Sequence, residues 1–139
     1  MDAFSAFMAE NVEKLENKKV AISKRFKDDK GQPIEWEIKP LTCEENDDLQ
    51  RRAMVQKKLP TGQTVRELDQ VKYTALMLTE SVVYPDLHNA KLQDSYGVKT
   101  PEALLKKMLY PREEALLASE VMGYNQIEDL GDKVDEAKN

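Results

Sequence analysis

The strongest constraint on the fold is an alternation of apolar and polar residues on both sides of a short turn, over residues 19–39. A period of two is typical of β-strands with one buried face. The turn, Asp28-Asp29-Lys30-Gly31, is a hairpin signal, and a three-residue loop that ends on Gly31 puts glycine where a bulge requires a positive φ. The alternating apolar residues are Val20, Ile22 and Phe26 before the turn and Ile34, Trp36 and Ile38 after it.

This loop length also predicts the register of the hairpin. The expected pairs are Phe26 with Ile34, Lys24 with Trp36, Ile22 with Ile38 and, on the outer face, Arg25 with Glu35. Lys24 is the one charged residue on the apolar face, so we expect it to lie across the Trp36 indole or to extend past the sheet edge. Because a two-stranded hairpin is marginal in water, helices must cover it or strands of another chain must extend it.

The segment before the hairpin, residues 2–16, has apolar residues at helical three- and four-residue steps. Asp2 is a candidate N-cap. The residues of this stripe are Phe4, Phe7, Met8, Val12 and Leu15. We expect an amphipathic helix that docks on the rest of the domain, or one whose phenylalanines pack against a partner or a second copy.

The chain from residue 41 onward has a helical pattern. Thr42 and Glu45 match a capping box that opens a helix to about Lys58, and Thr64 and Glu67 repeat this motif after a break at Pro60 and Gly62. The second helix is predicted to be central, and Tyr84-Pro85 ends it. Its apolar stripe is Leu68, Val71, Ala75, Leu78 and Val82.

Three further helical segments follow. A short turn over 90–96 closes at Gly97, and Thr100-Pro101 is an N-cap followed by proline at the first helical position. Pro111 starts the last helix, and Gly123 is expected to close it. The predicted fold is therefore α+β and mostly helical, with an N-terminal helix and β-hairpin followed by a bundle of about four to five helices.

The expected organisation is one domain over residues 1–124, divided into a helix-plus-hairpin part (1–40) and a helical part (41–124). Residues 125–139 are acidic, and we expect this tail to be flexible when the chain is alone. The chain has 139 residues, which suits a single domain of ordinary size.

The composition supports no catalytic chemistry. The chain has one histidine, His88, and one cysteine, Cys43, which lie in different predicted elements without the spacing of a zinc site. The five glycines never cluster into a phosphate-binding loop. We therefore expect no enzymatic activity, no catalytic residue, no metal and no cofactor.

Nucleic-acid binding is also disfavoured, because the net charge is −5. The one basic cluster is Arg51, Arg52, Lys57 and Lys58 on the first predicted helix after the hairpin. The break at Pro60 and Gly62 is longer than the link of a helix-turn-helix, so a solvated helix face is the simpler interpretation.

Two blocks of the sequence resemble the tail assembly chaperones of long-tailed phages and defective prophages. The first is Ser23-Lys24-Arg25-Phe26 with Asp28, Gly31, Pro33-Ile34, Trp36 and Ile38-Lys39. The second is Val82-Val83-Tyr84-Pro85-Asp86-Leu87 with Leu92-Gln93-Asp94-Ser95-Tyr96-Gly97-Val98, and a leucine-rich helical region follows it. The similarity covers roughly residues 4–124.

This resemblance implies a non-enzymatic assembly factor in the cytoplasm of the bacterial host. Members of the family bind the tape-measure protein, keep its long hydrophobic helices soluble and are displaced when tail-tube subunits polymerise around it. A longer form made by frameshifting near the end of the reading frame recruits tail-tube subunits. No membrane or nucleic-acid partner is implied, and self-association is compatible with the role.

The resemblance carries over no fixed set of binding residues. The candidate partner-binding residues are Phe4, Phe7, Leu105, Met108, Leu109, Leu116, Leu117 and Val121. The alternative for each leucine-helix residue is a place in the core. Two other functions stay open at this point: a structural subunit of a phage tail or neck, and a small DNA-binding regulator.

Overall fold

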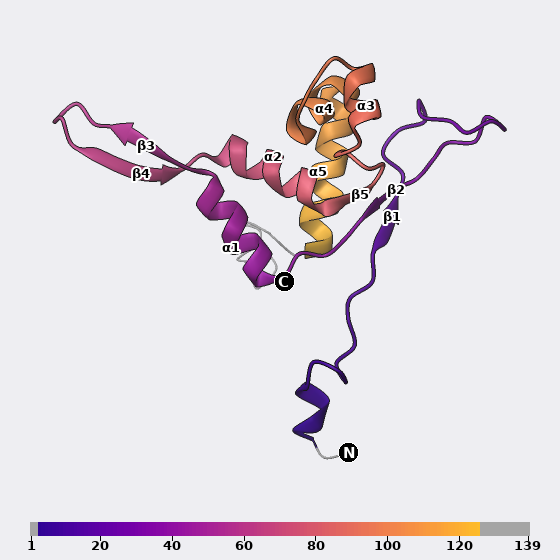
Figure 1. Ribbon diagram of the computed structural model, residues 1–139, viewed down its shortest axis with the longest axis horizontal. Coiled ribbons are helices and arrows are strands. Elements are labelled where there is room, and N and C mark those ends of the chain that lie inside the picture. The colour runs from indigo at the N-terminus through magenta and orange to yellow at the C-terminus, as the bar shows by residue number, and fades with distance from the viewer. Residues whose placement is uncertain (1–2, 126–139) are drawn as a thin grey trace, which may run out of the picture.

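The computed structural model describes residues 3–125, which form a helical body with one small sheet (Figure 1). The sheet is antiparallel and has the strand order β1–β2–β5. Its strands are β1 (Lys18–Val20), β2 (Trp36–Ile38) and β5 (Val82–Tyr84), and a separate hairpin consists of β3 (Met54–Lys58) and β4 (Thr64–Leu68). The helices are η1 (Ser5–Phe7), α1 (Cys43–Arg52), α2 (Gln70–Ser81), α3 (Ala90–Ser95), α4 (Pro101–Met108) and α5 (Pro111–Asn125).

Helix α2 is central, as expected, and packs against α1, α4, α5 and β5. The core lies between these helices and the inner face of the sheet. Among its fully buried side chains are Trp36, Ile38, Met77, Leu104, Leu117 and Val121. The α+β class is thus confirmed, but the description as mostly helical, with a helix and hairpin leading a helical bundle, is wrong in part because strands occur throughout the first two thirds of the chain.

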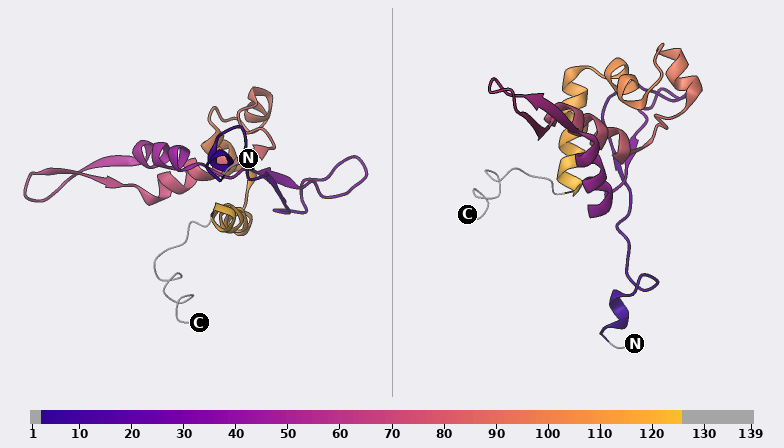
Figure 2. Two further views of the ribbon diagram at one scale, coloured as in Figure 1. Left: turned by 90° about the horizontal axis from the view of Figure 1, so that it is seen from below. Right: turned by 60° about the vertical axis from the view of Figure 1, so that its left-hand side comes forward.

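Three segments project from this body (Figures 1 and 2). They are the N-terminal arm (residues 3–16), the loop over residues 21–35 and the β3–β4 hairpin, and the last two extend to opposite sides of the body. Each therefore has most of its surface away from the core.

The predicted helix over residues 2–16 is wrong for the described residues, because only the single 3₁₀ turn η1 forms there. Phe4 is 74% exposed and Phe7 82% exposed. A short helix is marginal in water unless its apolar face packs on another surface. Within residues 3–125, no part of the body packs against the apolar side chains of this segment. The candidate cap Asp2 lies outside the described residues.

The predicted hairpin is confirmed at its tip and wrong at its base. Lys27 is bridged to Pro33, the Ile34 N–H donates to the Phe26 carbonyl at 2.8 Å, and Gly31 has φ 78°. In the ladder, however, Trp36 pairs with Val20 in place of Lys24.

The base of the first strand is therefore displaced by four positions, and Lys18 pairs with Ile38 in place of Ile22. An even displacement preserves the buried parity, so Val20 and Ile22 still lie in the core. The expected contacts of Lys24 with Trp36 and of Arg25 with Glu35 are wrong, because residues 21–25 leave the ladder. The third strand is β5 of the same chain, not a strand of another copy.

The capping box of Thr42 and Glu45 is confirmed, but its helix ends at Arg52 and not near Lys58. The predicted capping box of Thr64 and Glu67 is wrong, since both residues lie on β4. Residues 54–68 form a hairpin instead, with Gly62 at φ 91° in its turn. Helix α2 begins one residue after Asp69, whose side chain accepts from the Lys72 N–H.

The face of α2 that is buried differs from the predicted stripe. Leu78 and Val82 are buried, whereas Leu68 lies at the end of β4 and Val71 is 75% exposed. Tyr73, which the predicted stripe did not include, is buried in the core.

The later elements follow the sequence more closely. Helix α3 ends just before Gly97, which has φ 70°, and the Thr100 side chain caps α4 at Ala103 N–H. The prediction that Gly123 ends the last helix is wrong, since α5 continues through it to Asn125. The tail over 126–139 lies outside the described residues, and the single-domain organisation stays a prediction.

Candidate functional site

The described residues contain no group of three or more His, Cys, Asp or Glu side chains that could hold a metal ion. Cys43 is exposed at the start of α1, and His88 is exposed in the loop before α3. No helix among residues 3–125 is long and apolar enough to cross a membrane. The surface features that stand out are concave and apolar, which is the character of a docking site.

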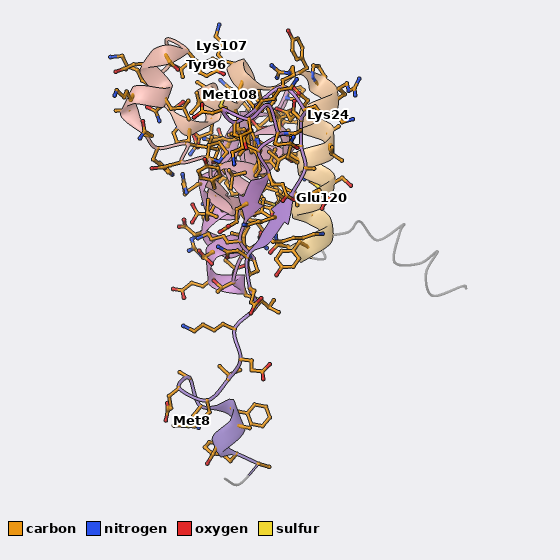
Figure 3. The ribbon with its side chains drawn as sticks, turned by 90° about the vertical axis from the view of Figure 1, so that its right-hand side faces the viewer. Met8, Lys24, Tyr96, Lys107, Met108 and Glu120 are labelled. Carbon is orange, nitrogen blue, oxygen red and sulfur yellow. The ribbon has the colours of Figure 1, made fainter. Side chains whose placement is uncertain are left out.

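The larger feature is a groove of about 620 Å³ between residues 21–25 and the first turns of α5, called here the α5 groove. Its apolar lining comes from Ile22, Pro33, Tyr110 and Leu116, and its charged lining from Lys24, Arg25, Arg112 and Glu113. Figure 3 shows Lys24 beside the upper part of α5, with Glu120 lower on the same helix. The displacement of the first strand forms this groove, because it moves residues 21–25 out of the ladder.

One wall of the groove is closed by an ion pair between Arg25 and Glu113. Arg25 Nε donates to Glu113 Oε2 at 2.9 Å, and Arg25 Nη2 donates to Glu113 Oε1 at 2.6 Å and to the Met108 carbonyl at 2.8 Å. The guanidinium also stacks over the rings of Phe26 and Tyr110 at 4.9 and 4.8 Å. This side chain therefore connects the 21–35 loop to the start of α5.

Glu113 is a buried carboxylate whose charge is compensated by a guanidinium and by neighbouring hydrogen-bond donors. The hydrogen-bonded Arg25 guanidinium is the main cause that lowers the pKa of Glu113 to about 2, against the opposing effect of burial. Ser23 and the backbone N–H of Tyr110, which donates to Oε1 at 2.8 Å, lower this pKa further. The same pair raises the pKa of Arg25. The pair is structural and leaves no proton to transfer near neutral pH.

The remaining charge in the α5 groove is positive. Lys24 and Arg112 are exposed, and neither forms an ion pair within residues 3–125. An acidic segment with apolar side chains would therefore match both the walls and the charge of this groove.

A second, shallower groove of about 230 Å³ lies where α2 faces the end of α4 and the start of α5. We call it the α2 groove. Val71, Ala75 and Leu78 line it, and the ion pair of Lys106 with Glu114 at 2.7 Å lies beside them. Three members of the predicted stripe thus border a surface groove, and the most exposed of them is Val71.

Three contacts fix the root of the arm to the body. The Tyr124 hydroxyl donates to the Glu16 carbonyl, Asn17 Nδ2 donates to Glu37 Oε2 at 2.9 Å, and Lys18 Nζ lies 3.1 Å from Glu120 Oε2. These contacts lie at the far end of α5 from the α5 groove. From this root the arm runs away from the body (Figure 1).

The structure separates the eight predicted partner-binding residues into two groups. Five of them lie in the core of the single chain, with exposed fractions of 9% or less: Leu105, Met108, Leu109, Leu117 and Val121. The other three, Phe4, Phe7 and Leu116, are exposed, and Leu116 lines the α5 groove. Partner contact by any of the eight stays a prediction.

The pairing of Arg25 with Glu113 was not predicted from the sequence. One local signal was present, since Glu113 follows Tyr110 by three residues, the spacing of a carboxylate that caps a helix start. Nothing local indicates that an arginine of the hairpin reaches this carboxylate.

The basic cluster considered for DNA binding is divided between two elements. Arg51 and Arg52 lie on α1 near Asp48, at 3.7 Å each, and Lys57 lies on β3 at 3.7 Å from Glu67. Partly paired cations on a helix end and a hairpin form no recognition helix.

Comparisons with known proteins agree with the fold. A family model described as the phage XkdN-like tail assembly chaperone protein matches residues 4–138. The phage-like element PBSX protein XkdN of Bacillus subtilis (strain 168) is 34% identical over 97% of this chain and 93% of its own length. An uncharacterized protein of the same organism, YqbN, is 30% identical over 97% of this chain and 92% of its own length. A crystal structure of the protein YqbN superposes with a TM-score of 0.77 at 26% identity, covering 92% of this chain and 99% of that one.

Proposed function

Because the chain belongs to the phage XkdN-like tail assembly chaperone family, we propose that it binds the tape-measure protein of a phage tail and keeps that protein soluble before the tube forms. The match over residues 4–138 is the observation that carries this proposal. The protein acts as a non-enzymatic factor in the cytoplasm of the bacterial host.

The shape of the molecule supports a binding role. Large apolar side chains are exposed on the arm, at the start of α2 and along the α5 groove. Clustered exposed apolar side chains are typical of surfaces that contact other proteins. A chaperone for a long helical protein requires such surfaces, because apolar helix faces are protected by packing into grooves.

We assign the tape-measure contact to the α2 groove. Val71 is 75% exposed there, and the groove has helices on both sides, which suits a partner helix that lays its apolar face between them. The five buried residues of the leucine helices lie in the core, and both of these helices pack against α2. Of the eight predicted contact residues, Phe4, Phe7 and Leu116 are the ones that we propose to contact another chain directly.

Recruitment of tail-tube subunits is the second part of the proposal. It is assigned to a longer form of the chain made by frameshifting near codon 138, where Lys138 and Asn139 are compatible with adenine-rich codons. The nucleotide sequence at this position is the measurement that checks it. A sequence without a slippery run contradicts the assignment.

The experiment that tests tape-measure binding is co-expression with the tape-measure protein encoded by the same phage or prophage, followed by pull-down and light scattering. The expected result is a soluble complex with many copies of this chain per tape-measure chain. A Val71→Asp variant should lose most of this complex, because it puts a charge into the apolar groove.

Lys91→Asp on α3 is the matched control, since it adds the same carboxylate at an exposed helical position outside the groove. It should retain the complex. If the tape-measure protein stays insoluble and unbound while this chain forms rings or tubes that persist in purified particles, the chaperone proposal fails and the alternative of a structural tail or neck subunit replaces it.

A further inference from the structure

Within residues 3–125, no surface covers the apolar side chains of the arm. Phe4, Phe7 and Leu15 are each more than 70% exposed, and Met8 and Val12 are also exposed. The arm is acidic as well, since it carries three glutamates, at positions 10, 13 and 16, and one lysine, at position 14. It therefore combines two aromatic anchors with a net negative charge.

The α5 groove has the opposite character. Its walls are apolar, and its cations Lys24 and Arg112 form no ion pair with any other described residue. Its volume of about 620 Å³ lies within the range of roughly 300–1,000 Å³ in which compact groups are buried by protein clefts. Aromatic side chains that enter well-packed pockets are the usual anchors of protein interfaces.

Arm and groove lie at opposite ends of α5. The arm leaves the body where Glu16 contacts Tyr124, whereas the groove lies at Arg112 and Leu116, near the first residue of the helix. The contacts at the root direct the arm away from its own groove (Figures 1 and 2). A second copy placed below the first in the view of Figure 1 would present its groove to this arm.

From this complementarity we propose that the arm of one copy docks through Phe4 and Phe7 in the α5 groove of a second copy, with Glu10 and Glu13 facing Lys24 and Arg112. The contact joins two different surfaces, so a series of copies keeps one free arm at one end and one free groove at the other. Copies therefore add head to tail, and the series either closes into a ring or grows as an open helix. This association goes beyond the proposed tape-measure binding and does not depend on it.

Sedimentation velocity of the full chain alone tests the proposal, with two variants confined to exposed side chains. The arm variant is Phe4→Ser with Phe7→Ser, and the groove variant is Lys24→Glu with Arg112→Glu. The wild-type chain should sediment as species larger than a monomer whose share of the protein grows with concentration. Each variant alone should be monomeric, with association weakened at least about tenfold.

The decisive sample is an equimolar mixture of the two variants. The groove variant still has an intact arm, and the arm variant still has an intact groove, so the mixture should form a heterodimer that does not grow further. Tyr84→Ser, which changes an exposed aromatic residue on β5 outside both grooves, is the matched control and should associate like the wild type.

Three results overturn the proposal. The first is a wild-type chain that stays monomeric throughout the micromolar range, as it would if the arm docked in its own groove or if the groove took only a helix of another protein. The second is an arm or groove variant that associates like the wild type. The third is a mixture that contains monomers alone. Because the tape-measure protein is absent from this measurement, its outcome is separate from that of the chaperone test.

Discussion

Arg25 and Glu113, 88 positions apart in the chain, form a two-hydrogen-bond ion pair that fixes the 21–35 loop to the start of α5. The side chain of Glu113 is 8% exposed, and that of Arg25 is 45% exposed. The pair is thus buried on the carboxylate side and reaches solvent on the guanidinium side. It forms one wall of the α5 groove.

Glu113→Gln should lower the free energy of unfolding by roughly 1–3 kcal/mol, because it removes the charge that accepts two hydrogen bonds from Arg25 inside the protein. Urea unfolding followed by circular dichroism measures this difference. Glu114→Gln is the control one residue further along. It alters the more exposed pair with Lys106, so its effect should stay within about 0.5 kcal/mol. Equal effects of the two substitutions would contradict the structural role of Glu113.

The stabilisation by Glu113 should depend on pH in the acid range. Its pKa is lowered from 4.5 to about 2 on folding, so the folded state favours the carboxylate. The contribution is complete above the unfolded value and is lost as the pH falls from 4.5 through about 2. The difference in unfolding free energy between the wild type and Glu113→Gln should therefore be constant around neutral pH and shrink over this window. A difference that stays constant down to about pH 2 would show that the ion pair does not set it.

Two substitutions distinguish the observed N-cap of α2, Asp69, from the predicted N-cap, Thr64. Asp69→Ala should lower the free energy of unfolding by about 1 kcal/mol, because the Asp69 side chain accepts a hydrogen bond from the Lys72 N–H. Thr64→Ala should change the free energy of unfolding by no more than about 0.5 kcal/mol, because Thr64 lies exposed on β4. Thermal or urea unfolding of both variants provides the measurement. A larger loss for Thr64→Ala would favour a helix that starts at the predicted position.

The β3–β4 hairpin should exchange its amide hydrogens much faster than α2. Within the described part of the chain its strands pair only with each other, and none of their residues is fully buried, whereas α2 lies in the middle of the core. Elements with few buried contacts open locally at low free energy. Hydrogen exchange followed by mass spectrometry compares the two segments directly. Protection of the hairpin equal to that of α2 would indicate that a further surface covers it.

Features that depend on a few neighbouring residues could be predicted from the sequence. The turn that ends at Gly31, the capping box of Thr42 and Glu45, and the start of α4 at Thr100-Pro101 all have their partners within eight residues. Their geometry is determined by local hydrogen bonds and permitted φ angles, so the letters alone indicate it.

Prediction from neighbouring residues was wrong where a helix start and a β-strand are compatible with the same residue spacing. Thr64 and Glu67 have the spacing of a capping box. In the structure, however, both lie on β4, with Val65 and Arg66 between them, and this strand pairs with β3. The choice between helix and hairpin depends on pairing across the turn at Gly62, which a helical count does not include.

The candidate site was the least predictable part, because it requires contacts between distant segments. The displaced register at Trp36 and the pair of Arg25 with Glu113 both follow from the position of α5 against the hairpin. The sequence contains each residue but no local sign of their meeting. The resemblance to a family indicated the function, whereas only the structure distinguished the exposed Leu116 from its buried neighbour Leu117.

The order of the strands has a consequence for synthesis on the ribosome. Ile38 on β2 pairs with Val82 on β5, and Arg25 forms its ion pair with Glu113. The N-terminal third of the chain therefore cannot complete its contacts until most of the protein has been made. Contacts between segments that are far apart in the sequence also form slowly. During translation, Trp36 and Ile38 are therefore uncovered for a long interval, and the nascent chain itself is a candidate for protection by the folding factors of the cell.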